Sequence, residues 1–222
     1  METRDLFIPV LIVAGVVIIT VTAILTYKVS SKHPKAYVPF NLPVLLYPYV
    51  YMLVLLFGYI FNQVTPETFK PDYDYAETIG AGVIIFLTIH PFIIGALIGD
   101  ILLNRREKIP AVKAARFNML IKLIQVPAYI FHFILGVLGS FASIWGIGFV
   151  GFAIIIDLIT IFFTGTQCLA AIIGICKQKG LLKWQAILFA ILSYIYCIDV
   201  AISIVMFVMV SRKMKAKDSL PE

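Results

Sequence analysis

The 222-residue chain is 61% hydrophobic and only 14% charged, and its mean hydropathy is +1.00. Soluble domains are about 45–50% apolar and about 25% charged, so this composition excludes a soluble globular fold. The formal net charge of +6 comes from basic residues in short loops beside apolar segments. Because the chain has no basic domain, we expect no nucleic-acid partner.

Six apolar segments follow one another, each long enough to cross the roughly 30 Å hydrocarbon core of a bilayer. They cover residues 6–27, 40–61, 76–103, 115–140, 144–176 and 183–210. The sequence therefore predicts an all-α fold, a polytopic transmembrane helix bundle that forms a single integral membrane domain. The first segment is too long for the apolar part of a signal peptide, so we interpret it as a retained helix.

The basic residues predict the orientation of these segments. Lys and Arg concentrate in the first, third and fifth loops, whereas the second loop has only Lys70 and the fourth has none. Basic loops stay on the cytoplasmic side, so we expect the N-terminus outside. The basic tail, residues 212–217, does not fit, because six spans place it outside as well. A break near Gly165 would turn the tail inward but leaves a piece too short to span, so six spans are retained.

One side of the fourth segment carries polar side chains inside an otherwise apolar stretch. The positions, at steps of four, three, four and three, are Asn118, Lys122, Gln125, Tyr129 and His132. This spacing is that of one face of an α-helix. A central lysine that faces lipid costs roughly 2.5–3.5 kcal/mol, so we expect this face to lie toward other helices or water.

The fifth and sixth segments carry similar polar faces. These residues are Asp157, Thr160, Thr164 and Gln167 in the fifth segment, and Tyr196, Asp199 and Ser203 in the sixth. From the rise of about 1.5 Å per residue, Lys122 and Asp157 lie at similar depth, as do His132 and Asp199. We therefore predict a Lys122–Asp157 ion pair and a His132–Asp199 hydrogen bond.

Simpler interpretations of the same residues remain open. Paired charges inside a membrane often only hold helices together. A lysine near a helix end can also extend its amine to the interface, and Lys122 is close enough to do so. Asp100 lies at the end of a span, where headgroups and water solvate it, so we assign it no chemistry.

The sequence contains no motif of a known catalytic or nucleotide-binding site. HExxH, GxSxG, Walker A and GxGxxG are all absent. His132, Asp157 and Asp199 are spread over different depths and form no recognisable metal or acid–base site. We therefore expect no cofactor and no metal, and an enzyme is the least favoured function.

Three runs in the second half of the chain are distinctive: NMLIKLIQVPAYI at 118–130, DLITIF at 157–162 and YCIDVAIS at 196–203. They resemble a family of small polytopic membrane proteins of unknown function from low-GC Gram-positive bacteria. The resemblance covers residues 113–213. It implies a multi-pass protein of the bacterial plasma membrane and adds no biochemical activity.

The inward polar faces favour membrane transport, by a small carrier or by a permease subunit. We call these residues the polar seam: Asn118, Lys122, Gln125, Tyr129, His132, Asp157, Thr160, Thr164, Tyr196, Asp199 and Ser203. A permease subunit would need a separate ATPase as its partner. The alternative is a non-catalytic accessory or immunity subunit that binds other membrane proteins. In either case the lipid bilayer surrounds the chain.

Overall fold

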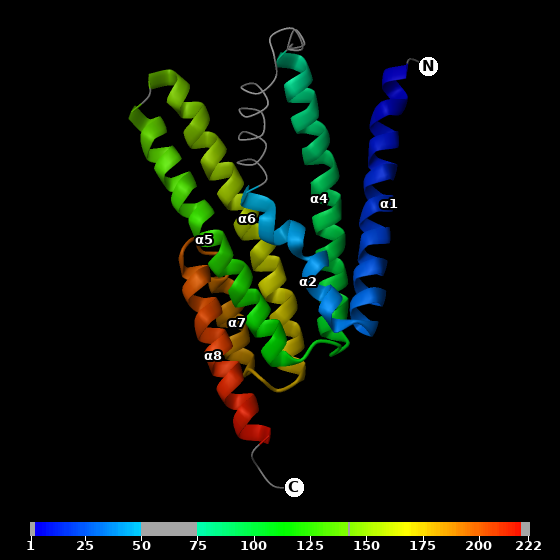
Figure 1. Ribbon diagram of the computed structural model, residues 1–222, viewed down its shortest axis with the longest axis vertical. Helices are drawn as coiled ribbons and strands as arrows, with labels where there is room; N and C mark the ends of the chain where they lie inside the picture. The colour runs from blue at the N-terminus through cyan, green and yellow to red at the C-terminus, as the bar shows by residue number, and fades with distance from the viewer. Residues whose placement is uncertain (1–2, 50–74, 142, 219–222) are drawn as a thin grey trace, which may run out of the picture.

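The computed structural model describes residues 3–49, 75–141 and 143–218, and these form helices without any β-strand. The long helices are α1 (Thr3–Lys32), α4 (Tyr75–Arg105), α5 (Ala111–Phe141) and α6 (Ser143–Lys177). The shorter elements are η1 (Pro34–Ala36), α2 (Tyr37–Phe40), α7 (Lys183–Leu192) and α8 (Ile198–Asp218). Residues 42–49 are also helical. The predicted all-α fold is confirmed (Figure 1).

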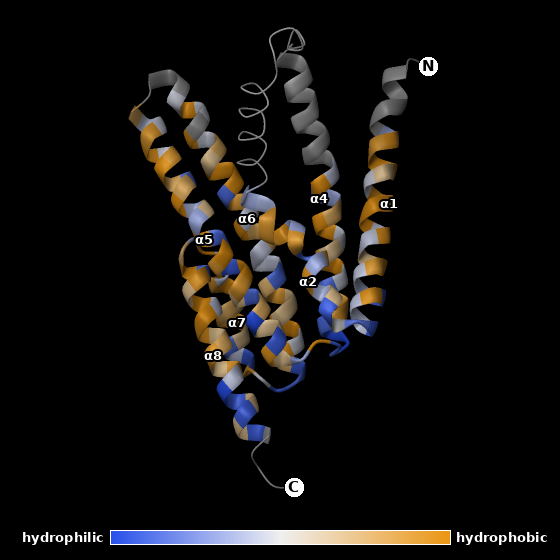
Figure 2. Ribbon diagram, in the orientation of Figure 1, coloured by the Kyte–Doolittle hydropathy of each residue, from blue (hydrophilic) through white to orange (hydrophobic). Residues whose placement is uncertain are grey.

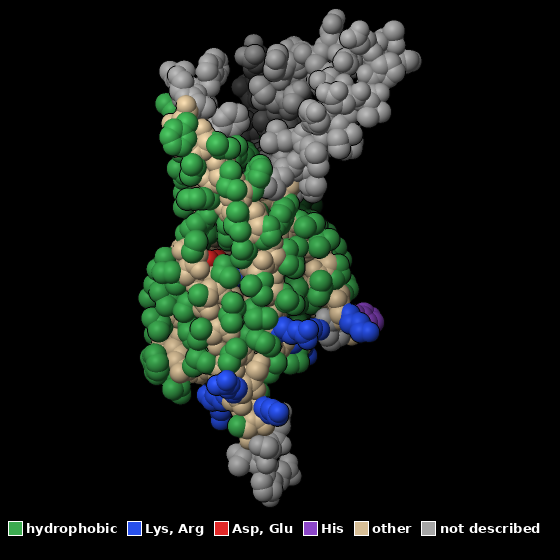
Figure 3. Space-filling view, turned by 60° about the vertical axis from the view of Figure 1, so that its left-hand side comes forward, with side chains coloured by type: hydrophobic (Ala, Val, Ile, Leu, Met, Phe, Trp, Pro, Cys, Tyr) green, Lys and Arg blue, Asp and Glu red, His purple; other side chains and the backbone are tan. Residues whose placement is uncertain are grey.

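Three helices of the described chain are long and apolar enough to cross a membrane: Pro9–Lys32, Ala111–Phe141 and Gly146–Lys177. Their outer faces carry large apolar side chains, of which Phe133 is 66% and Leu158 62% exposed. Figure 3 shows that apolar side chains cover most of the described surface on that side of the molecule. Such a continuous apolar surface is compatible with contact to lipid.

Four of the predicted segments, 6–27, 76–103, 115–140 and 144–176, each lie within one helix. The segment 40–61 lies mostly outside the described residues. α6 continues without a break past Gly165. The prediction of a single helix over 183–210 is wrong, because α7 ends at Leu192 and α8 begins at Ile198.

The break between α7 and α8 consists of turns over residues 193–197, with a positive φ of 63° at Cys197. Hydropathy does not reveal it, because these five residues contain no charged side chain, glycine or proline and lie within a long apolar stretch. With 10 residues, α7 is about 15 Å long, half the thickness of the hydrocarbon core. The chain therefore turns back inside the molecule, and α7 and α8 form a helical hairpin (Figure 1).

The start of α7 and the end of α8 lie at the same end of the molecule. A Cβ atom added at Gly180, just before α7, would lie 3.6 Å from Cγ1 of Val210 in α8. The basic tail of α8 therefore lies beside the α6–α7 loop, whereas a sixth span that crosses the bundle would place it at the opposite end. The basic tail did not fit the topology of six spans because that topology lacks the turn at residues 193–197.

The basic loops gather with this tail at one end of the molecule, here called the basic end (Figure 2). It includes Lys32, Lys35, Arg105, Arg106, Lys108, Lys177, Lys179, Lys183, Arg212 and Lys213. Hydrogen bonds join its loops: Lys177 Nζ donates to the carbonyl oxygen of Arg105 over 2.8 Å, and Gln178 Nε2 donates to that of Ile109 over 2.8 Å. The main apolar core lies next to it, where Leu103, Ile175 and Met206 are fully buried.

Helices α1 and α4 lie side by side and make close backbone contact (Figure 1). A Cβ atom at Gly95 would lie only 2.6 Å from the carbonyl oxygen of Ile19, and one at Gly99 only 2.6 Å from Cβ of Thr26. Small residues four apart allow two helices to approach closely in this way. The two glycines therefore set the distance between α1 and α4.

We expect Gly95→Ala to destabilise the protein by about 1–3 kcal/mol, because the new methyl group collides with the backbone of α1. Thermal unfolding of the purified protein in detergent measures the change. The matched control is Gly151→Ala, where a Cβ atom meets nothing within 4 Å. That control should be neutral or slightly stabilising, as Ala is a better helix former than Gly. Equal losses in both variants would contradict the role of Gly95.

Candidate functional site

The most deeply buried charged group of the polar seam is the Lys122 ammonium of α5, which is 0% exposed. Its Nζ lies 2.7 Å from Oδ2 of Asp199 and donates a hydrogen bond of 2.7 Å to Oγ1 of Thr164. It also donates to the carbonyl oxygen of Ser193 over 3.4 Å. One lysine thus joins α5 to α6 and to both arms of the hairpin.

The charges of this ion pair match the ends of the two helices that meet at the break. Ser193 caps the C-terminal end of α7, and its carbonyl oxygen faces the lysine. Asp199 lies in the first turn of α8. A cation at a helix C-terminus and an anion at a helix N-terminus are both favourable. A break inside the bundle is therefore tolerated, because protein groups satisfy its polar backbone.

A second pair lies nearer to the α5–α6 connection. Nδ1 of His132 in α5 is 2.6 Å from Oδ1 of Asp157 in α6. The His132 side chain is 1% exposed and that of Asp157 is 14% exposed. The pair therefore borders an accessible space, whereas the Lys122–Asp199 pair is closed off.

The partners in these two pairs are exchanged relative to the prediction. We expected Lys122 with Asp157 and His132 with Asp199, and both expectations are wrong. The prediction placed Asp199 too far from the basic end, because it assumed an unbroken helix from residue 183. Because the chain turns back after α7, Asp199 lies about 15 Å from the start of α7. Lys122 lies about 17 Å from the start of α5, so the two side chains are at similar depth.

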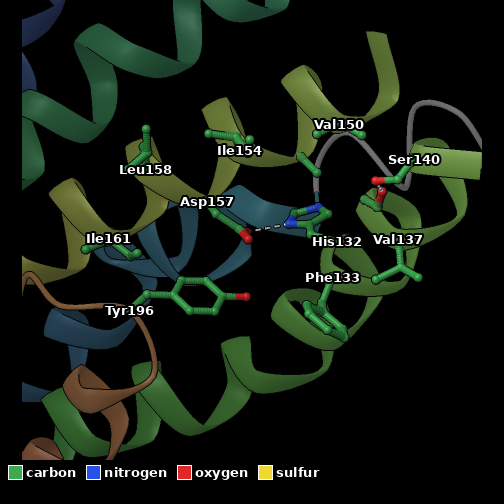
Figure 4. Close-up of a pocket in the computed structure, with 12 residues that line it drawn as sticks. His132, Phe133, Val137, Ser140, Val150, Ile154, Asp157, Leu158, Ile161 and Tyr196 are labelled. Atoms are coloured by element: carbon green, nitrogen blue, oxygen red, sulfur yellow. Dashed lines mark hydrogen bonds and ion pairs between the residues drawn. The ribbon is translucent and has the colours of Figure 1, made fainter. Parts of the chain in front are cut away.

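The accessible space beside His132 and Asp157 is a cavity of about 430 Å³ between α5 and α6, and it opens on the outer face where Phe133 and Leu158 are exposed. Its remaining walls are mainly apolar, formed by Phe133, Val137, Val150, Ile154, Leu158 and Ile161. Tyr196, from the turn before α8, directs its hydroxyl toward the space next to the pair (Figure 4). The cavity thus combines an apolar lining with one polar corner.

Two tyrosines lie between the buried pair and the cavity. The rings of Tyr129 and Tyr196 are 5.2 Å apart, and Tyr196 Oη donates to the carbonyl oxygen of Tyr129 over 3.4 Å. The remaining seam residues are buried but contribute less. Thr160 and Ser203 donate only to their own helices, and Gln125 Nε2 donates to the carbonyl oxygen of Val44. Asn118 is buried as well, at 2% exposure.

Asp100 belongs to a third cluster, which the sequence analysis missed. It is 0% exposed, so the expectation that headgroups and water solvate it is wrong. Its Oδ1 accepts a hydrogen bond of 3.1 Å from Asn41 Nδ2, and its Oδ2 accepts one of 3.3 Å from Gln167 Nε2. The segment around α2 folds back over α4 and covers this carboxyl. A signal was present, because Gln167 continues the polar face of the fifth segment.

Tyr37 in α2 completes this third cluster. Gln167 Nε2 lies 3.5 Å from its hydroxyl oxygen. Burial and the nearby Asp100 raise the pKa of the Tyr37 phenol well above its ordinary value, so the hydroxyl stays protonated and remains a donor. In the part of the chain that the structure describes, no three His, Cys, Asp or Glu side chains come together as metal ligands would.

No protein-family model, curated protein or solved structure matches this chain. The resemblance to a family of small membrane proteins from low-GC Gram-positive bacteria therefore stays a prediction. The features of the chain that bear on function are the three side-chain clusters and the cavity.

Proposed function

We propose that the chain is a multi-pass protein of a bacterial plasma membrane, with its basic end in the cytoplasm and the start of α1 outside. The apolar outer surface and the three helices of spanning length support the membrane location. Because Lys and Arg remain on the cytoplasmic side of bacterial membranes, the single basic end supports this orientation. The C-terminal tail then lies inside, together with the other basic segments.

We further propose that the protein is a small membrane carrier that binds its substrate in the cavity between α5 and α6. The observation that carries this proposal is an apolar cavity of about 430 Å³ with a His–Asp pair at one corner, open to the outer face of an apolar bundle. Ionisable side chains within a membrane are costly and commonly line substrate or proton pathways. The lining favours a small amphipathic substrate, with an apolar body and one polar group that reaches His132 or Asp157.

Proton movement is the natural energy source for such a carrier. The His132–Asp157 pair can hold or release a proton as the polar group of a substrate arrives. The buried Lys122–Asp199 pair keeps the hairpin in place behind the cavity, with Tyr129 and Tyr196 between the two pairs. In this mechanism the first pair meets the substrate and the second pair holds the helices together.

Reconstitution into liposomes that enclose a pH-sensitive dye tests the carrier. Under an imposed pH gradient, organic cations, organic anions and zwitterions of amphipathic character are added in turn. At least one class should move protons in the native protein, and Asp157→Asn should reduce that flux by about a hundredfold, the scale of a lost proton-transfer group. The control is Glu107→Gln, a carboxyl in the exposed α4–α5 loop, which should leave the flux unchanged.

Affinity purification from native membranes separates the remaining possibilities. Folded protein that is recovered alone and moves no protons with any of the three classes would contradict the carrier. A stoichiometric ATPase would identify a permease subunit, which uses the same cavity but a different energy source. A stable complex with another membrane protein, without flux, would support the accessory or immunity subunit instead.

A further inference from the structure

A second pocket lies at the basic end, between the start of α7 and the second half of α8. Its volume is about 510 Å³, and it is lined by Gly180, Leu182, Gln185, Met209, Arg212 and Lys213. None of these residues belongs to the polar seam or borders the cavity between α5 and α6. A ligand of this pocket is therefore distinct from the substrate of the proposed carrier.

The charged side chains that line this pocket are both positive. Arg212 and Lys213 are exposed, and no Asp or Glu of the described chain is among the lining residues. Neither of the two takes part in an ion pair within the described residues. Arginine can bind a phosphate group through two parallel hydrogen bonds, and lysine adds a compact positive charge. The pocket is therefore electrostatically complementary to a phosphate group.

The walls of the pocket continue into apolar surface along both helices. On α7, Leu188 lies three residues after Gln185, and its side chain is exposed. On α8, Val205 lies four residues before Met209 and is exposed as well. Residues three or four apart share a helix face, so both side chains extend the walls away from the basic end. A positive pocket that leads into apolar surface matches a ligand with an anionic head and hydrocarbon chains.

Trp184 indicates the level of the pocket in the proposed membrane. Its side chain is exposed, and it stands between Lys183 and Gln185 in the first turn of α7. Exposed tryptophans of membrane proteins concentrate at the level of the lipid headgroups. The pocket beside it therefore lies where lipid phosphates lie, on the cytoplasmic side in the proposed orientation.

We propose that this pocket binds one anionic phospholipid of the cytoplasmic leaflet. Arg212 and Lys213 contact the phosphate, and the acyl chains lie over Leu188 and Val205. Basic pockets between helices on the cytoplasmic side are suited to anionic headgroups. Such a lipid touches both arms of the hairpin and holds the start of α7 beside α8. The inference rests on the proposed membrane location and orientation, and it does not depend on the carrier.

Native mass spectrometry of the full chain in detergent micelles tests the site. The protein is titrated separately with phosphatidylglycerol and with phosphatidylcholine of the same acyl chains. The native protein should bind one phosphatidylglycerol at least about tenfold more tightly than phosphatidylcholine, because only the first carries a net negative charge. Inorganic phosphate in excess should not displace the bound lipid, since it lacks the apolar chains.

Two double variants separate a built pocket from general attraction to charge. Arg212→Gln with Lys213→Gln should abolish the preference for phosphatidylglycerol. The matched control is Lys215→Gln with Lys217→Gln, which removes the same charge from exposed positions of α8 outside the pocket. This control should keep the preference. All four side chains are exposed, so we expect both double variants to fold.

Three results would overturn the proposal. The first is a native protein that binds the two lipids equally. The second is an equal loss of preference in both double variants, which would reduce the binding to unspecific charge attraction. The third is displacement of the lipid by inorganic phosphate, which would assign the pocket to the free anion. Because the measurement uses micelles and no flux, a negative result leaves the membrane location and the carrier to their own tests.

Discussion

Replacing Lys122 with methionine is expected to lower the free energy of unfolding by about 3–5 kcal/mol, the usual effect of removing one partner from a buried ion pair. The loss is large because Asp199 keeps its charge and Oδ2 loses its ammonium partner at 2.7 Å. The carbonyl oxygen of Ser193 at the end of α7 loses its donor at the same time. Unfolding in mixed micelles, followed by circular dichroism, measures the change.

A second substitution identifies the partner of the lysine. Combining Lys122→Met with Asp199→Asn removes both charges and should recover most of the lost stability. Combining Lys122→Met with Asp157→Asn should recover none, because Asp157 pairs with His132. Recovery by the Asp157 variant in place of the Asp199 variant would show that the two pairs are assigned the wrong way round.

The second prediction concerns the sides of the membrane on which three positions lie, and its outcome is all or none. We expect single cysteines at Glu107 and Lys215 to react with a membrane-impermeant maleimide only after the cells are permeabilised. A cysteine at Ser140 should react in intact cells. The reason is that the α4–α5 loop and the tail of α8 share the basic end, whereas Ser140 lies near the opposite end of α5 (Figure 1).

This labelling requires a background in which Cys168, Cys176 and Cys197 are replaced, since all three are free thiols. All three positions to be labelled are exposed. The informative comparison is between Glu107 and Lys215. If α7 and α8 formed one continuous span, these two cysteines would react from opposite sides, and the hairpin would be refuted.

Much of the helical architecture could be predicted from sequence because its signals are local. Apolar length places α1, α4, α5 and α6, and the spacing of Lys122, Gln125 and His132 identifies the buried face of α5. These features depend on residues only a few positions apart. They therefore remain visible without any knowledge of the neighbouring helices.

The pairing of the charges and the third cluster could not be predicted in this way. Both depend on contacts between distant segments: Lys122 and Asp199 are 77 positions apart, and Gln167 and Asp100 are 67 apart. A turn of apolar residues at 193–197 shifts the depth of Asp199, and hydropathy does not register it. In the sequence Asp100 stands at the end of a span, and only the fold brings the segment around Asn41 over it.

The hairpin also determines when the protein can be completed during synthesis. In the proposed membrane location, α5 enters the bilayer long before Asp199 leaves the ribosome, so every nascent chain passes through a stage in which Lys122 lacks its partner carboxylate. α7 is too short to stay across the bilayer by itself, and the Ser193 carbonyl oxygen just after it accepts a hydrogen bond from that same lysine. Assembly of the interior therefore depends on α8, which is made well after α5. A chain that is cut short before α8 exposes an unpaired intramembrane lysine, a feature by which a quality-control protease can distinguish it from the finished protein.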